Sequence, residues 1–323
     1  MGKTKRLVKS FTRLVLPIIV LGVLAVAAAS VWLVYTVAVP PKQAYLVTPE
    51  KYGQLSTRGS KVTDENWKNR DGSQSRGWVL RGSENAPAVI LLHRYGSDRS
   101  HLLDLGVKLN EATNFTVLMP DQRGHGTNPT INFTSFGGCE ADDISGALEF
   151  LRGLKTEAQT PLIGQSIGIY GVEMGALVAL SVAAKDEYVK ALVLDSVPES
   201  SDAVLAAAVG ARFPFASSVT SKIARLGTYA YFYNGCYMRD AVCETAKSVS
   251  KRQILLLAGS DAAQFQDSTS ALAKCFPNPA KIESKLDLNP SGYGITNASL
   301  EQSEAYDRRV IEFFKLALGN NPL

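Results

Sequence analysis

The hydrophobic pattern begins with one long apolar segment near the N-terminus. From Leu14 to Tyr35, 22 consecutive residues carry no charge. At about 1.5 Å per residue, a helix of this length spans roughly 33 Å, which is enough to cross a hydrocarbon core of about 30 Å. The segment therefore predicts a transmembrane helix over residues 14–36.

The flanking residues predict the orientation of that helix. Five basic residues precede it, and no acidic residue occurs before Glu50; the five are Lys3, Lys5, Arg6, Lys9 and Arg13. Trp32 and Tyr35 lie where an outer aromatic belt would be. The positive-inside rule then places the N-terminus in the cytoplasm and the rest of the chain outside the plasma (inner) membrane. A cleaved signal peptide, processed near residues 27–29, is the alternative, but the apolar run continues past this point, which favours an uncleaved anchor.

Beyond about residue 62, short apolar runs alternate with segments of helical periodicity. Expected strands cover 67–69, 77–81, 88–92, 115–119, 167–170, 191–194, 254–257 and 282–288. Expected helices cover 102–112, 144–154 (entered through Asp142 and Asp143), 176–185 and a closing segment that ends at Gly319. Asp71-Gly72 between the first two strands is a hairpin signal. This alternation predicts an α/β domain with a largely parallel sheet flanked by helices.

One segment interrupts the alternation. Residues 198–250 contain no buried-strand run and are rich first in alanine and then in aromatic residues between Tyr229 and Tyr233. We expect a helical cap here, with the aromatic side chains in its core. The predicted organisation is a basic tail at 1–13, the transmembrane helix at 14–36, a stalk at 37–62 and the α/β domain at 63–321.

The charge distribution excludes one class of partner. The chain has 34 basic and 30 acidic residues, so without the five N-terminal basic residues the balance is 34 − 5 = 29 against 30. Nucleic-acid binding requires a basic domain, and this one is neutral. We therefore expect no nucleic-acid partner.

All four cysteines follow the apolar segment. An exported domain permits disulfides, and Cys236 and Cys243 are the nearest pair in sequence. We expect them to be bonded to each other, with four free thiols as the alternative. No C-x-x-C pattern occurs, so no zinc or redox site is indicated, and we expect no metal or cofactor.

The stretch 163–177 contains two candidate nucleophile turns. Residues 164–168 read G-Q-S-I-G and match the serine-hydrolase pattern G-x-S-x-G, whereas residues 171–175 read G-V-E-M-G. A nucleophile elbow requires a buried strand before it and a helix after it. Only Glu173 satisfies this, because Ser166 follows a loop and precedes the strand. The elbow is therefore expected at Glu173.

Three further motifs accompany the elbow. Residues 91–96 read L-L-H-R-Y-G, residues 121–126 read D-Q-R-G-H-G, and residues 258–261 read A-G-S-D after a strand. In this order, and with the cap in its usual place, residues 65–319 resemble the α/β-hydrolase superfamily, most closely its exported, membrane-anchored peptidase and esterase relatives. The resemblance implies an α/β-hydrolase fold and a nucleophile–acid–histidine triad.

The catalytic triad implied by the resemblance is degenerate. Glu173 occupies the nucleophile position, Asp261 matches the acid, and Ile295 is our prediction for the histidine position. No histidine follows His125 anywhere in the chain. The resemblance also implies backbone oxyanion donors at Met174 and at Arg94 or Tyr95.

Several roles for Glu173 remain open. Its carboxylate could occupy the oxyanion hole, form an acidic ligand pocket with Asp261 and His93, or stand solvated at an exposed turn. Attack by Glu173 itself is disfavoured, because no histidine would activate water to release the ester intermediate. The sequence favours a membrane-anchored pseudo-hydrolase that binds or scaffolds an unknown small molecule or protein. The alternative is an ester or peptide hydrolase with a non-standard site around Glu173, Asp261 and His93.

Overall fold

The computed structural model describes residues 2–53, 61–277 and 281–319, and divides into two compact units. The first comprises Met1–Ala38 and Leu205–Gly235, and the second comprises Val39–Val204 and Cys236–Leu323. Residues 54–60 of the predicted stalk and residues 278–280 and 320–321 of the predicted domain lie outside the described part.

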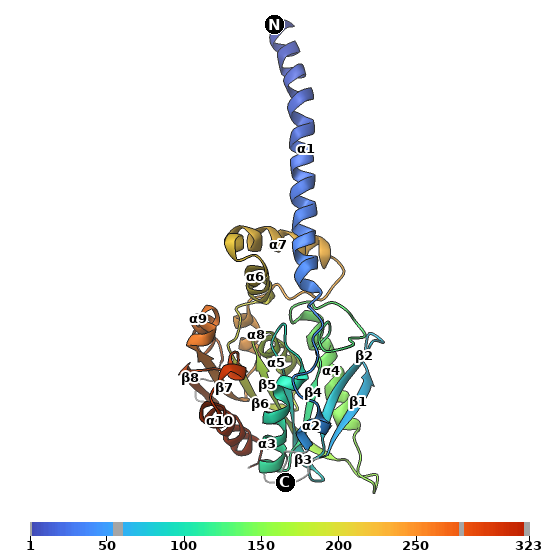
Figure 1. Ribbon diagram of the computed structural model, residues 1–323, viewed down its shortest axis with the longest axis vertical. Coiled ribbons are helices and arrows are strands. Elements are labelled where there is room, and N and C mark those ends of the chain that lie inside the picture. Colours follow the sequence, from blue (N-terminus) through green and yellow to red (C-terminus); the bar gives the residue numbers. More distant parts are fainter. Residues whose placement is uncertain (1, 54–60, 278–280, 320–323) are drawn as a thin grey trace. The chain divides into compact units, whose positions relative to one another are not determined.

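The second unit contains an eight-stranded sheet (Figure 1). Its strands are β1 Val62–Lys68, β2 Gln74–Leu80, β3 Ala86–Leu92, β4 Thr116–Pro120, β5 Ile163–Val172, β6 Val189–Asp195, β7 Gln253–Gly259 and β8 Ile282–Leu288. The order is β1-β2-β4-β3-β5-β6-β7-β8; β2 runs antiparallel to β1 and β4, and the pairs from β4 to β8 are parallel. The largely parallel sheet and the β1–β2 hairpin predicted from the sequence are confirmed.

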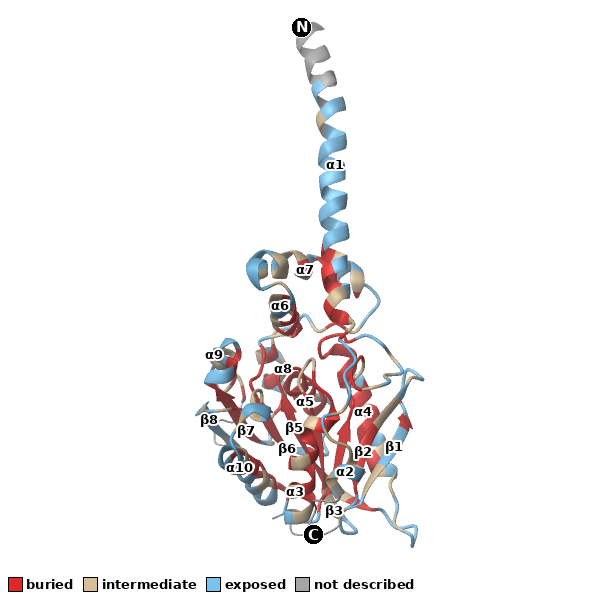
Figure 2. Cartoon of the chain, viewed as in Figure 1, coloured by how far each residue is buried: buried red, intermediate tan, exposed pale blue. Residues whose placement is uncertain are grey.

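Helices cover both faces of this sheet. They are α3 Leu103–Thr113, α4 Gly138–Gly153, α5 Met174–Lys185, α8 Val242–Ser248, α9 Ala263–Leu272 and α10 Leu300–Gly319. Alternate strand residues such as Val89 and Leu91 pack with α3 and α10 in one core cluster, as the two-residue period of a strand requires. Figure 2 shows the central strands as the most buried part of this unit, whereas β1 and β8 at the two edges are largely intermediate or exposed.

The start of α4 differs from the prediction. The helix begins at Gly138, so Asp142 and Asp143 lie in its second turn and not at its N-terminus. The buried Glu140 carboxylate instead accepts hydrogen bonds from the backbone N–H groups of Ser135 and Gly137. Glu140 thus satisfies amide groups that precede the helix, which acidic residues one turn later cannot reach.

Part of the predicted stalk packs on the α/β domain. Tyr45 donates a hydrogen bond of 2.6 Å to Asp121, and the backbone N–H of Leu46 donates one of 2.9 Å to Ser100. A short helix, α2 Pro49–Gly53, places Tyr52 against Asp104. The segment at 45–53 therefore belongs to the domain surface and is not a free spacer.

The disulfide prediction is wrong. Cys236 is bonded to Cys139, and Cys243 is bonded to Cys275. Cys236 lies directly on the start of α4, where a Cβ added to Gly138 would come within 1.5 Å of the Cys236 carbonyl oxygen. Cys243 lies in the first turn of α8, which packs against α9. Closeness in sequence was therefore a poor guide to closeness in the fold, and the alternative of free thiols is also excluded.

Removing either bridge is expected to destabilise the second unit. The bridges join residues 97 and 32 positions apart, for which the chain-entropy relation gives about 4.7 and about 3.7 kcal/mol. We expect Cys139→Ser/Cys236→Ser to lower the free energy of unfolding more than Cys243→Ser/Cys275→Ser, measured by urea denaturation without reductant. A peptide map showing a Cys236–Cys243 link would contradict both the pairing and this ranking.

The first unit contains α1 Gly2–Ala38, most of α6 Ser201–Arg212, the short 3-10 helix η2 Pro214–Ala216, and α7 Ser217–Tyr231. The cap is helical, as predicted. Its aromatic segment is only partly core, however: Phe232 is buried, Tyr231 is half-buried, and Tyr229 and Tyr233 are exposed. The core assignment therefore fails for two of these side chains.

One helix of the described residues is long and apolar enough to cross a membrane. It is α1 over Arg13–Ala38, with a mean hydropathy of 2.8. A cleavable signal sequence meets the same criteria. The helices Ser201–Arg212 and Pro214–Tyr231 also qualify if they are counted together, but they meet at a bend of 120°.

Candidate functional site

The site is built around a tight turn between β5 and α5. Glu173 occupies this turn with φ of 50° and ψ of −111°, a backbone conformation that non-glycine residues rarely adopt. Gly171 and Gly175 make the turn possible, because a Cβ at either would come within 2.5 Å of a backbone oxygen. Ser166, in contrast, lies inside β5, which begins at Ile163 and therefore earlier than expected. The strand–turn–helix geometry of an elbow is found at Glu173.

The Glu173 side chain turns back onto two backbone amides. Its Oε2 accepts a hydrogen bond of 2.7 Å from the N–H of Tyr95 and one of 3.0 Å from the N–H of Met174. These are two of the donors expected from the sequence, and Tyr95, not Arg94, supplies the first. Glu173 is only 3% exposed, so it is not the solvated residue that one interpretation proposed.

Burial dominates the electrostatics of Glu173. It raises the pKa of the carboxyl from its usual 4.5 to about 7, against the opposing effects of the two backbone amides and the positive charge of Arg94. The carboxyl group therefore titrates near neutral pH. Two hydrogen bonds to a single oxygen form the arrangement with which oxyanion holes hold a negative charge.

Asp261 and the loop after β8 lie on the other side of the site. Asp261 is exposed and accepts hydrogen bonds of 2.9 Å from both the N–H and the hydroxyl of Ser291. A Cβ added to Gly294 would come within 2.5 Å of the Asp261 carboxylate. Glu173 and Asp261 thus have separate hydrogen-bond donors. The arrangement gives no direct support to an acidic pocket formed by the two.

Tyr293 is influenced by the charges of both carboxylates and was missed by the sequence analysis. After burial, the charge of Glu173 is the main cause that raises the pKa of Tyr293; Asp261 also raises it, and Arg94 lowers it. The Arg94 guanidinium stacks over the Tyr293 ring at 4.8 Å from its centre. Ile295, two residues further, packs against the apolar core. The contact of the 291–294 loop with Asp261 would have indicated Tyr293, but that contact is invisible in the sequence.

The buried histidines have no free nitrogen facing this site. His93 Nδ1 lies 2.8 Å from the carbonyl oxygen of Arg94, and its Nε2 accepts from the N–H of Gln122 at 3.1 Å. Burial and the neighbouring His125 lower the pKa of His93 to about 3. His93 is therefore a neutral ring with both nitrogens engaged, and it has no lone pair left for a substrate or water.

The chain is similar to known hydrolases in sequence and in fold. The family model of serine aminopeptidases, S33, matches residues 83–218. An esterase of Pyrococcus furiosus is 21% identical, with a TM-score of 0.61 over 87% of this chain and 100% of that one. The chain has the α/β-hydrolase fold, and the family match supports a place in the α/β-hydrolase superfamily. The comparison with curated sequences finds no match.

Two further α/β-hydrolase structures have the same fold at lower identity. An acylaminoacyl peptidase of Pyrococcus horikoshii is 14% identical, with a TM-score of 0.57 over 84% of this chain and 44% of that one. A dienelactone hydrolase of Anabaena variabilis is also 14% identical, with a TM-score of 0.55 over 80% and 99% of the two chains. At these identities the likeness establishes the fold and not the chemistry.

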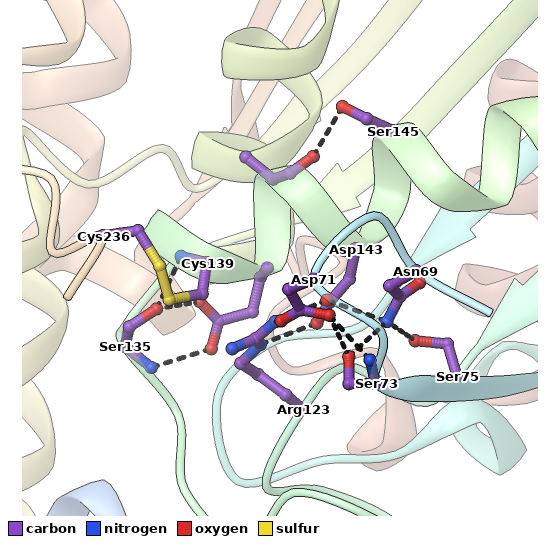
Figure 3. Close-up of polar contacts among 12 residues, drawn as sticks. Asn69, Asp71, Ser73, Ser75, Arg123, Ser135, Cys139, Asp143, Ser145 and Cys236 are labelled. Atoms are coloured by element: carbon purple, nitrogen blue, oxygen red, sulfur yellow. Dashed lines mark hydrogen bonds and ion pairs between the residues drawn. A yellow bond between two sulfur atoms is a disulfide. The ribbon is translucent and has the colours of Figure 1, made fainter.

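The D-Q-R-G-H-G loop at residues 121–126 supports the turn that carries Tyr95. His125 Nε2 accepts from the N–H of Gly96 at 3.1 Å, which fixes the residue after Tyr95. Arg123 in the same loop binds both carboxylate oxygens of Asp143 in α4, at 2.7 and 2.5 Å (Figure 3). His125 is thus a structural residue that holds one donor of the oxyanion hole in place.

Asp195, at the end of β6, is a second residue that the sequence analysis missed. It is fully buried and accepts hydrogen bonds from the hydroxyl of Tyr306 at 2.7 Å and the N–H of Gly292 at 2.9 Å. Burial raises its pKa. Asp195 therefore holds the loop that carries Tyr293 against the sheet. In the sequence, the feature that could have indicated Asp195 is that it is a charged residue at the end of the apolar run of β6.

Among the described residues, no group of three or more His, Cys, Asp or Glu side chains is arranged to hold a metal ion.

Proposed function

We propose that this chain is a membrane-anchored, exported α/β-hydrolase-like protein that binds or scaffolds and does not hydrolyse through a triad. One observation carries the proposal: the Glu173 carboxylate sits on the N–H groups of Tyr95 and Met174. In a hydrolase these donors receive the oxyanion of the reacting carbonyl group. Here the elbow residue occupies them itself, so an incoming carbonyl would have to displace it.

The other triad-equivalent positions agree with this proposal. We assign Asp261 to the acid position and Tyr293 to the histidine position, in preference to Ile295, because Tyr293 lies within electrostatic range of both Glu173 and Asp261. A half-buried tyrosine whose pKa is raised does not act as a general base at neutral pH. With His93 engaged at both nitrogens, the alternative non-standard hydrolase lacks a base for activating water.

The membrane anchor rests on α1. Its apolar length, with Arg13 at one end and Trp32 and Tyr35 near the other, supports a single-pass helix with a cytoplasmic N-terminus. The domain from residue 39 onward would then be extracytoplasmic, where the two disulfides can form. We propose the inner membrane as its location.

The purified full-length chain is expected to remain unlabelled by a fluorophosphonate probe and to leave short-chain p-nitrophenyl esters intact. The physical reason is that no serine stands at the elbow and the oxyanion donors are occupied. Gel fluorescence and ester absorbance measure the two properties, with Ser166→Ala as the matched variant. Labelling of the wild type that disappears in Ser166→Ala would place the nucleophile at Ser166 and overturn the proposal.

A further inference from the structure

The cap presents large apolar side chains that are mostly exposed. In and next to α7, Phe215 is fully exposed, and Val219, Leu226, Tyr229 and Tyr233 are 58%, 61%, 62% and 78% exposed. Val219, Leu226 and Tyr229 lie on one side of α7, because residues three or seven positions apart share a helix face. Phe215 precedes this helix in η2, Tyr233 follows its end at Tyr231, and the five side chains together are named the stripe. Soluble surfaces rarely carry so many large apolar groups together, and such a stripe marks an interaction site.

Basic residues accompany this stripe. Lys222 lies within it by helical spacing and Arg225 lies at its edge, and both are exposed. Ala224, Gly227 and Thr228 are buried on other sides of α7. A helix with aromatic and aliphatic residues on one face, together with lysine and arginine, has the composition of helices that lie in the lipid–water interface.

The α7 helix crosses α1 at close range within the same unit. A Cβ added to Gly227 would come within 2.2 Å of the Ser30 carbonyl oxygen, so only glycine permits this approach. Trp32 of α1 also packs against Phe213 of the cap, with ring centres 5.9 Å apart. Figure 1 shows α7 lying across α1 at this point. The position of α7 along α1 is therefore defined.

That position corresponds to the outer edge of a bilayer. From Arg13, the last charge before the apolar run, to Ser30 is 17 residues, or roughly 26 Å along a helix. The hydrocarbon core is about 30 Å thick, so the crossing point lies close to its far boundary. Trp32 and Tyr35 lie at the same level, where aromatic side chains gather in membrane proteins.

We infer that the stripe Phe215, Val219, Leu226, Tyr229 and Tyr233 inserts into the outer leaflet of the membrane that α1 crosses. The inference rests on the proposed anchor, and it adds a second, interfacial contact made by the cap. Lys222 and Arg225 then face the phospholipid headgroups. Because α7 runs across α1 in Figure 1, α7 can lie along the membrane surface while α1 crosses the bilayer.

Spin labels test this insertion in the full-length chain. All four native cysteines are in disulfides, so cysteines introduced as Val219→Cys and Leu226→Cys can be labelled selectively with a nitroxide. In vesicles of zwitterionic and anionic phospholipid, we expect collisions with oxygen to rise and collisions with a water-soluble nickel reagent to fall several-fold. The reference is Ser299→Cys, an exposed position of the other unit.

A label at Leu21→Cys, in the middle of α1, separates the two proposals. If the Leu21 label is in lipid and the labels at 219 and 226 are as accessible to nickel as that at 299, the anchor stands and the interfacial contact is wrong. If the Leu21 label is also exposed to water, the anchor itself is wrong. Immobilised labels at 219 and 226 that neither reagent reaches would show a protein partner or a second copy on the stripe, which also overturns the inference.

Discussion

A Glu173→Ser/Tyr293→His double variant is expected to acquire fluorophosphonate labelling and measurable hydrolysis of p-nitrophenyl acetate. Serine at 173 would occupy the same turn with positive φ, and without the glutamate carboxylate the N–H groups of Tyr95 and Met174 would be available to a substrate. Histidine at 293 would stand where the charges of both residue 173 and Asp261 act on the native tyrosine. Since a positioned general base contributes 10²–10⁴-fold, the double variant should exceed Glu173→Ser alone by at least about 100-fold in rate.

The single variant Glu173→Ser is the matched control, because it has the serine nucleophile and the unoccupied N–H donors of Tyr95 and Met174 but no general base. A second double variant, Glu173→Ser/Ile295→His, compares the position predicted from the sequence with that chosen from the structure. Higher activity in the Ile295→His background would reassign the histidine position. A folded double variant with no gain over Glu173→Ser would show that the site was lost at more than these two positions.

Replacing Glu173 by glutamine is expected to raise the free energy of unfolding at pH 8 by about 3 kcal/mol. Burial raises the pKa of Glu173 from 4.5 in its usual environment to about 7 in the fold. The folded state therefore holds a proton that the unfolded state releases between these two values, so this carboxyl makes stability fall as pH rises from 4.5 to 7. Above pH 7 the folded state contains the ionised carboxylate and bears the full free-energy cost of its burial. Glutamine has no charge to bury, and its side-chain oxygen can still accept hydrogen bonds from the two amides.

Urea unfolding of the detergent-solubilised chain at pH 5 and pH 8 measures this effect. The wild type should lose stability relative to Glu173→Gln as pH rises, and the two should converge at low pH. Other buried carboxyls with a raised pKa, such as Asp143 and Asp307, are unchanged and cancel in the comparison. Glu187→Gln, at an exposed position, is the control and should behave as the wild type. A constant difference between wild type and Glu173→Gln across this range would mean that Glu173 is ionised at all these pH values.

The fold could be predicted because its signals are local. The apolar runs of β3, β4, β6 and β7 bury both faces of a parallel sheet, and their composition alone marks them as central strands. The elbow was also predictable, because a strand before Glu173 and a helix after it are short-range features. The sequence also shows that no histidine follows His125.

The pairing of distant side chains could not be read in this way. Cys236 bonds to Cys139 because the chain returns from the cap onto the start of α4, 97 positions away in sequence. The loop that carries Tyr293 is held by Asp195, at the end of β6, and by Asp261, just after β7, through the N–H groups of Gly292 and Ser291. Sequence spacing does not reveal these contacts, because the two carboxylates come from parts of the chain far from this loop.

The sequence by itself determined the α/β-hydrolase fold, the apolar N-terminal helix and the glutamate at the elbow, because each depends on residues close together in the chain. Only the tertiary structure decided what that glutamate does. Its carboxylate reaches the N–H of Tyr95, 78 positions earlier, because β3 and β5 are neighbours in the sheet and end at the same edge. Likewise, only the packing of α7 on α1 shows where the exposed stripe of the cap lies along the apolar helix.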